Sequence, residues 1–228
     1  EGVEKRCIMK YFPLTIVDDF FPDVEYVLDL AKKIEYQNLG STSFPGKISK
    51  DVDKQLHDWV ERKILNIFWD TPILQKYVES QVDFQKIEPS SNYNYGLIHH
   101  EVDPKCAVVV YLNDNPTPDS GTSFYKLKDE YQYYDENCSE YIEYIKETTS
   151  FHGGIKSSNY EKIVENHQNK FEEIMRVQPK QNRMILYSPE VWHAQTSYGN
   201  NTRYTLRCFL HVVSMIFNNR EVMFPLLR

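Results

Sequence analysis

The residues best suited to chemistry are two histidines and one acidic residue: His99, Glu101 and His193. His99 and Glu101 lie two positions apart in an expected strand, 93–101 (YNYGLIHHE), so both side chains face the same side of it. His193, in the sequence SPEVWHAQTSYGN, shortly precedes the last long expected strand and is the obvious third ligand. Two imidazoles and one carboxylate on one face of a metal leave the opposite positions open. This arrangement suits non-heme Fe(II), which must bind a co-substrate and O2 together.

Two neighbouring residues compete for these roles. His100 is an alternative imidazole and Asp103 an alternative acid. They are three positions apart and would face opposite sides of a regular strand, so we rank them second. The remaining histidines lack comparable context and are expected to be structural or exposed; they are His57, His152, His167 and His211.

A permanently charged residue follows His193 by ten positions. Arg203 begins the expected strand 202–213 (TRYTLRCFLHVV) and shares one face of it with Thr205 and Arg207. A guanidinium binds a carboxylate through two parallel hydrogen bonds, and its burial is costly without an anionic partner. A dicarboxylate co-substrate would supply that partner. The alternative is a surface arginine on an edge strand.

The elements that must position these residues change character along the chain. A short strand over 12–18 precedes two helices, 23–36 and 53–68, whose apolar residues recur at helical spacing. The polar loop between the helices contains a Pro45-Gly46 turn, and its residues Phe44 to Lys50 are where we expect substrate contacts. Short strands separated by turns then follow, at 81–88, 93–101, 106–112, 121–126, 183–187 and 202–213. This order predicts an α+β protein whose body is a sandwich or barrel.

Residues 127–176 interrupt the strands with a polar, tyrosine-rich stretch. We expect two helices, 135–147 and 159–175, inserted into one domain that covers 1–228, because so few aliphatic residues could not build a separate core. The tyrosines could line a substrate groove, but a solvated helix pair is the favoured interpretation. They are Tyr131, Tyr133, Tyr134, Tyr141 and Tyr144.

Composition excludes several classes of function. The net charge of −7 argues against a nucleic-acid partner, which needs a basic surface. Apolar runs are too short for a membrane span, and the first ten residues predict no secretory signal. The four cysteines form no C-x-x-C pair, so a thiolate zinc site is not indicated and a reducing, cytoplasmic location is expected.

Several segments together resemble a known superfamily. IHHE, KCAVVVYLND, GTSFY and NRMILYSPEVWHAQTSYGNNTRYTLRCFL are similar to the 2-oxoglutarate/Fe(II)-dependent dioxygenases, and within them to prolyl-hydroxylase-like members, including phage-encoded ones. The similarity covers about residues 80–126 and 177–213. It implies a double-stranded β-helix, or jelly roll, with helices packed on one sheet. For a phage protein, the cytoplasm would be that of the host.

The resemblance also assigns roles to individual residues. His99, Glu101 and His193 match the metal motif H-x-D…H, and Arg203 matches the basic residue that binds 2-oxoglutarate. Tyr111 matches a tyrosine that helps hold the far carboxylate of 2-oxoglutarate, although a core tyrosine is an equal alternative. The implied cofactors are Fe(II), 2-oxoglutarate and O2. The implied reaction hydroxylates a peptidyl, prolyl-like residue or a small molecule and releases succinate and CO2.

One departure from the motif keeps other functions open. The acid is glutamate in place of aspartate, which moves the carboxylate by about one bond length. This motivates a second hypothesis, a jelly-roll binding module that has lost turnover. A third hypothesis, a nucleic-acid demethylase of the same superfamily, is disfavoured by the acidic net charge.

Overall fold

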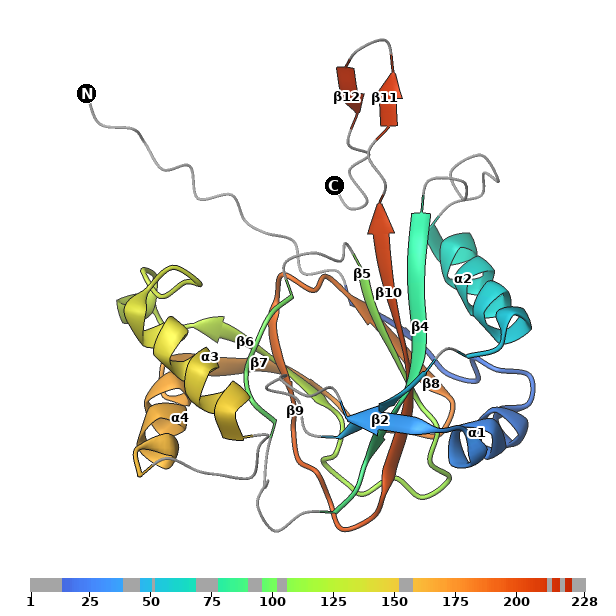
Figure 1. Ribbon diagram of the computed structural model, residues 1–228, viewed down its shortest axis with the longest axis horizontal. Coiled ribbons are helices and arrows are strands. Elements are labelled where there is room, and N and C mark those ends of the chain that lie inside the picture. Colours follow the sequence, from blue (N-terminus) through green and yellow to red (C-terminus); the bar gives the residue numbers. More distant parts are fainter. Residues whose placement is uncertain are drawn as a thin grey trace.

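The computed structural model describes residues 14–38, 46–50, 52–68, 78–89, 96–101, 106–151, 158–212, 215–217 and 220–222. A seven-stranded sheet forms one wall (Figure 1), and every neighbouring pair in it is antiparallel. The order is β1 (Leu14–Val17), β8 (Arg183–Tyr187), β5 (Cys106–Tyr111), β10 (Arg203–Val212), β4 (Val78–Ile87), β3 (Lys47–Ser49) and β2 (Tyr36–Asn38). Five of these strands confirm the strands expected at 12–18, 81–88, 106–112, 183–187 and 202–213.

A smaller sheet faces the first. Its order is β7 (Phe171–Val177), β6 (Thr122–Leu127) and β9 (Trp192–Gln195), and residues 96–101 run beside β9. The two sheets enclose a core of Ala107, Tyr111, Phe124, Val177, Ile185 and Tyr187. Among the described residues, β11 (Met215–Phe217) and β12 (Arg220–Val222) form a separate two-stranded ribbon (Figure 1). The predicted jelly roll is therefore confirmed.

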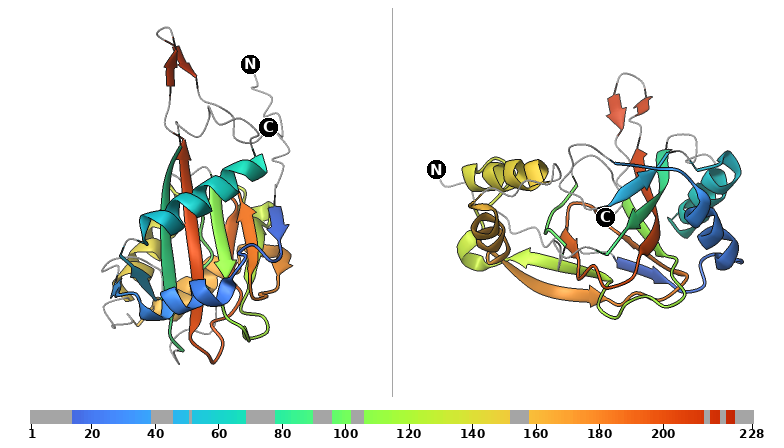
Figure 2. Two further views of the ribbon diagram at one scale, coloured as in Figure 1. Left: turned by 90° about the vertical axis from the view of Figure 1, so that its right-hand side faces the viewer. Right: turned by 60° about the horizontal axis from the view of Figure 1, so that its bottom comes forward.

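Two helices cover the outer face of the large sheet (Figure 2), as expected. α1 (Val24–Lys33) begins after Asp23, whose carboxylate accepts a hydrogen bond from the Tyr26 amide, and α2 (Lys54–Phe68) follows β3. Alternate residues of β10 pack toward these helices: Leu206, Cys208 and Leu210 are fully buried there. Because strand side chains alternate, Arg203, Thr205 and Arg207 face the interior between the sheets.

The inserted segment differs from its prediction. Its helices are α3 (Ser139–Phe151) and α4 (Tyr160–Gln168), preceded by a short 3-10 turn, η2 (Asp129–Tyr131). The expected helix 159–175 is wrong in its second half, since the chain leaves α4 and forms β7. Glu172, Glu173 and Met175 favour helix locally, but pairing with β6 decides the structure.

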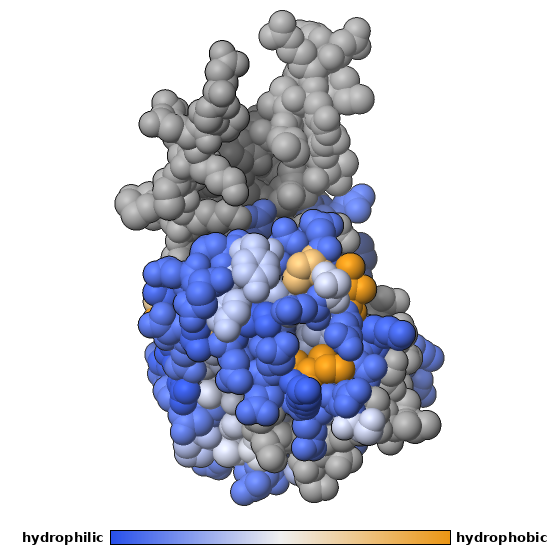
Figure 3. All heavy atoms as spheres, turned by 90° about the vertical axis from the view of Figure 1, so that its left-hand side faces the viewer, coloured by the Kyte–Doolittle hydropathy of each residue, from blue (hydrophilic) through white to orange (hydrophobic). Residues whose placement is uncertain are grey.

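The prediction that the inserted helices are a solvated pair is wrong, because most of their tyrosines are buried. Tyr134, Tyr141 and Tyr144 are buried, whereas Tyr133 is 64% exposed. The buried tyrosines form an aromatic cluster with Tyr160, Val164, Phe171, Leu97, Ile98 and Ala194. Aromatic rings bury a large area each, so few aliphatic residues are needed. The outer surface on this side is mostly hydrophilic (Figure 3). No helix in the described part of the chain is long and apolar enough to span a membrane.

Candidate metal centre

Backbone pairing with β9 positions two of the expected ligands. The His99 amide donates to the His193 carbonyl over 3.0 Å, and the His193 amide donates back over 2.8 Å. The Glu101 amide donates to the Pro189 carbonyl over 2.9 Å. At Gly96 a side chain would clash, because its Cβ would overlap the Gln195 carbonyl oxygen. The described part of the expected strand 93–101 forms only this isolated bridge, not a regular strand.

The structure brings His99, Glu101 and His193 together. The Nε2 atom of His99 lies 3.4 Å from Glu101 Oε1, and the Nε2 atom of His193 lies 3.4 Å from Glu101 Oε2. All potential ligand atoms fall within 4.8 Å of one another. The His193 side chain is 5% exposed and that of His99 is 34% exposed, so the cluster opens to solvent on the His99 side.

Hydrogen bonds on the far side of each ring prepare both imidazoles as ligands. His99 Nδ1 donates to the Leu97 carbonyl over 2.8 Å, and His193 Nδ1 donates to the Val191 carbonyl over 2.7 Å. A carbonyl can only accept, so in the neutral rings the lone pairs are on the Nε2 atoms that face Glu101. Glu101 Oε2 is buried without a hydrogen-bond partner. A bound cation would satisfy this oxygen and both nitrogens, so the donor set fits a divalent metal ion.

The charges in the cluster also fit a metal site. Burial acts to raise the pKa of Glu101, but the neighbouring His193 and His99 rings, in their protonated forms, hold it well below its ordinary value. Burial acts to lower the pKa of His99, yet the Glu101 carboxylate beside it raises this pKa overall. Glu101 is therefore ionised at neutral pH, as a metal ligand must be.

Of the two competing residues, the described one, His100, lies outside the cluster. His100 Nε2 is 4.0 Å from a carboxylate oxygen of Glu136, and its ring contacts Trp192 with centroids 4.4 Å apart. Asp103 and His152 lie outside the described residues. His167 is buried in the aromatic cluster, and His57 is bonded to Ser80 on the outer layer. His211 lies on β10.

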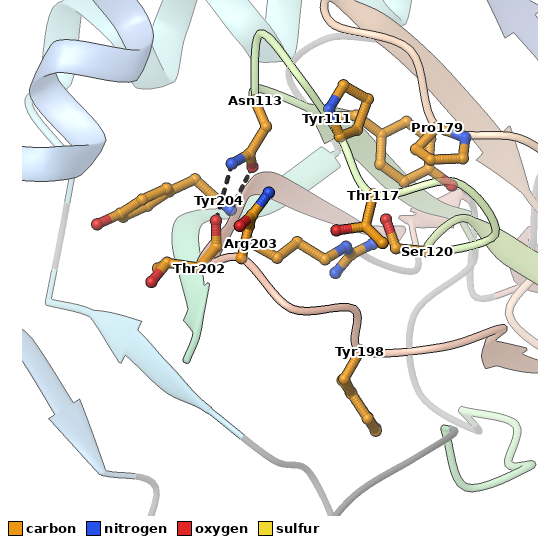
Figure 4. Close-up of a pocket in the computed structure, with 11 residues that line it drawn as sticks. Tyr111, Asn113, Thr117, Ser120, Pro179, Tyr198, Thr202, Arg203 and Tyr204 are labelled. Atoms are coloured by element: carbon orange, nitrogen blue, oxygen red, sulfur yellow. Dashed lines mark hydrogen bonds between the residues drawn. The ribbon is translucent and has the colours of Figure 1, made fainter. Parts of the chain in front are cut away.

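Arg203 lines a pocket, and no described residue supplies it with an anionic partner. Its guanidinium points toward Thr117 and Ser120 (Figure 4). Nη1 donates to Gln85 Oε1 over 3.3 Å, while Nε is buried without any partner. None of the ion pairs among the described residues includes Arg203, and burial lowers its pKa. A buried guanidinium in this state can bind a carboxylate.

Tyr111 lies beside this arginine. Its ring centroid is 5.5 Å from Arg203 Cζ, and its hydroxyl pairs with Thr122 Oγ1 at 2.8 Å. Phe124 follows Thr122 by two residues on β6, and the centroid of its ring lies 6.4 Å from that of His193. Tyr111 is fully buried, so it belongs to the core between the sheets and lines the Arg203 pocket as well.

Sequence reasoning missed a second charged group in the interior. Arg207 Nε and Nη2 donate to the two carboxylate oxygens of Asp83 over 2.8 and 3.0 Å. Asp83 is 3% exposed, and the charge of Arg207 acts on the pKa of His99. The alternation of β4 and β10 carries the signal, because Arg207 and Asp83 are direct cross-strand neighbours.

Solved structures with the same fold include one that holds a metal and 2-oxoglutarate. HygX from Streptomyces hygroscopicus, with nickel, 2-oxoglutarate and hygromycin B bound, has a TM-score of 0.55 at 11% identity, covering 88% of this chain and 83% of its own. A Pseudomonas putida prolyl-4-hydroxylase has a TM-score of 0.50 at 13% identity, covering 88% of this chain and 93% of its own. A Trichoplax adhaerens prolyl hydroxylase, in complex with a hypoxia-inducible-factor peptide fragment, has a TM-score of 0.51 at 14% identity, covering 87% and 83%.

Sequence comparisons place the chain in one family. No curated protein matches it. The family model described as "Family of unknown function (DUF6445)" matches residues 4–198, most of the chain. The chain therefore belongs to this family, and its fold is the jelly roll found in 2-oxoglutarate- and iron-dependent oxygenases.

Proposed function

We propose that the protein is an Fe(II)- and 2-oxoglutarate-dependent dioxygenase. The observation that carries the proposal is the convergence of His99, Glu101 and His193 on one point, with a buried carboxylate oxygen left without a hydrogen-bond partner. In this assignment the three side chains hold the iron. Bound iron would supply the redox chemistry that couples the oxidative decarboxylation of 2-oxoglutarate to oxidation of a substrate C–H bond.

The 2-oxoglutarate site is assigned to the interior beside the metal cluster. Arg203 would bind the far carboxylate through two parallel hydrogen bonds, which would give its buried Nε a partner. Tyr111 would hold that carboxylate from the other side, since its ring lies next to the guanidinium. The rings of Phe124 and Tyr187 lie next to that of His193 and would exclude water from this side of the site.

Two classes of substrate are proposed as alternatives: a peptidyl, prolyl-like residue and a small molecule. Prolyl hydroxylases and the hygromycin-bound HygX share the fold and support these two classes. Hydroxylation would release succinate and CO2. The open side of the metal cluster, where His99 is partly exposed, is the face that a substrate could reach.

Metal and co-substrate binding test the assignment directly. Purified without oxygen, the protein should bind one Fe(II) per chain, and 2-oxoglutarate should then produce a weak visible charge-transfer band. His99→Ala should abolish both signals. His100→Ala is the matched control, because it removes the adjacent imidazole, which faces Trp192, and should leave them intact. Absence of both signals in the wild-type protein would overturn the proposal.

Turnover separates an enzyme from a binding module. With Fe(II) and 2-oxoglutarate bound, uncoupled oxygenase turnover should release succinate slowly even without the substrate. A protein that is fully loaded with both yet releases no succinate would be the non-catalytic module.

A further inference from the structure

One peptide unit connects the metal cluster to the inserted helices. In a trans peptide the carbonyl of residue 98 and the amide of residue 99 point in opposite directions. The His99 amide points to β9, where it bonds the His193 carbonyl. The Ile98 carbonyl therefore points away from β9, toward α3 and α4.

Two side chains from the insertion donate to this carbonyl. His167 Nε2, on α4, donates to the Ile98 oxygen over 2.8 Å. The Tyr144 hydroxyl, on α3, donates to the same oxygen over 3.3 Å. The two rings stack on each other with centroids 3.5 Å apart and planes 9° apart. A single peptide unit is thus held from both sides, by β9 and by the insertion.

The donor state of His167 is fixed by its surroundings. The Tyr134 hydroxyl lies 2.7 Å from Nδ1, so with Nε2 donating, Nδ1 accepts the tyrosine proton. Burial lowers the pKa of His167 to about 3, which keeps the ring neutral with a single proton. That proton is on Nε2 and is directed at Ile98.

We propose that His167 and Tyr144 are positioning residues of the metal centre, which hold His99 in its ligand orientation through the Ile98–His99 peptide unit. This inference rests on the proposed function, because it takes His99 as a metal ligand. Residues 96–101 pair with β9 on one edge through an isolated bridge, and among the described strands none pairs with their other edge. The insertion replaces that strand with side-chain donors. Its buried tyrosines and histidine therefore serve the site, although none of the described ones is itself a ligand.

The test compares variants at one position that differ in the donated hydrogen bond. His167→Leu removes the donor. In His167→Gln the amide nitrogen can reach Ile98 in place of Nε2, and the amide oxygen can accept from Tyr134. Both lose the ring stacking, so a difference between them reflects the hydrogen bonds to Ile98 and Tyr134, which only His167→Gln can replace. Mn(II) affinity, measured by electron paramagnetic resonance of the free ion, should fall about tenfold in His167→Leu and recover to within about threefold of wild type in His167→Gln.

A second pair covers the case in which substitutions at His167 prevent folding. Tyr144→Phe removes one hydroxyl and should weaken Mn(II) binding about threefold. Tyr141→Phe is its matched control, because this tyrosine belongs to the same cluster and has no hydrogen bond to residues 96–101 in the described structure. In the metal-free protein, amide exchange at His99 should be faster in Tyr144→Phe than in Tyr141→Phe.

The outcomes separate this inference from the proposed function. If wild type binds Mn(II) and all four variants bind it equally well, the positioning role is wrong and the oxygenase assignment stands. If His167→Gln binds as weakly as His167→Leu, the donated hydrogen bond is not the cause and the role is also overturned. If wild type binds no Mn(II) at all, both proposals fail.

Discussion

Replacing Arg203 by methionine should separate stability from co-substrate binding. Without 2-oxoglutarate the guanidinium makes one hydrogen bond of 3.3 Å to Gln85, and its Nε is buried without a partner. Losing that bond costs about 1 kcal/mol. Removing a buried, unpaired charge returns several kcal/mol of desolvation penalty, by order of magnitude. We therefore expect Arg203→Met to be as stable as wild type or more stable.

The same change should severely weaken 2-oxoglutarate binding. A pair of charge-assisted hydrogen bonds to a carboxylate contributes about 3 kcal/mol, which corresponds to a roughly 150-fold change in dissociation constant. Titrating 2-oxoglutarate into the anaerobic Fe(II) protein and following the charge-transfer band measures this change. Urea unfolding without co-substrate measures the stability.

Arg207 provides the matched control four residues along the same strand face. Arg207→Met leaves the Asp83 carboxylate buried without its bidentate partner, so it should lower the free energy of unfolding by about 3–5 kcal/mol. If Arg203→Met instead loses stability as Arg207→Met does, and keeps its affinity for 2-oxoglutarate, the reasoning is refuted and Arg203 is a structural residue.

Three further predictions concern single groups. Glu101→Gln removes the one negative charge of the metal cluster, and Mn(II) affinity measured by calorimetry should fall at least about 100-fold. Tyr111→Phe leaves Thr122 Oγ1 without its partner, so unfolding by urea should show a loss of about 1 kcal/mol, with 2-oxoglutarate affinity about fivefold lower. Because the pKa of His167 is lowered to about 3 from its ordinary 6.5, the unfolded chain binds the extra proton first and stability falls as the pH drops below 6.5. Relative to His167→Gln, wild type should lose about 2 kcal/mol between about pH 7 and about pH 5. Equal acid sensitivity of the two proteins would contradict this.

Sequence patterns predicted the strands that are apolar along nearly their whole length or whose side chains alternate between the two faces of the large sheet. β5 and β8 are of the first kind, and β10 is of the second, with Leu206 toward the helices and Arg203 toward the space between the sheets. β9 was not predicted because four residues around Trp192 are too short for a periodic signal. β7 was mistaken for helix because its five central residues are exposed, so it has no buried face to reveal its period.

The site could be predicted only in part for a related reason. The spacing along the sequence is enough to single out four candidate residues, which are His99, Glu101, His193 and Arg203. The link from His167 to the Ile98 carbonyl joins residues 69 positions apart through a backbone atom, which no side-chain pattern encodes. The buried tyrosines were assigned to solvent because the expectation counted aliphatic residues and overlooked aromatic area.

The charges of the interior offer an independent reason for a dianionic co-substrate. Arg207 and Asp83 neutralise each other. Glu101 contributes one negative charge, so a divalent cation bound there leaves one net positive charge, and Arg203 adds a second with no carboxylate paired to it among the described residues. A low-dielectric space with two uncompensated positive charges favours a ligand with two negative charges, one for the metal and one for the guanidinium. Removing either charge should therefore reduce the preference for 2-oxoglutarate over a monocarboxylate 2-oxo acid, and competition between the two acids in Arg203→Met measures it. An undiminished preference in that variant would show that the dianion is recognised elsewhere.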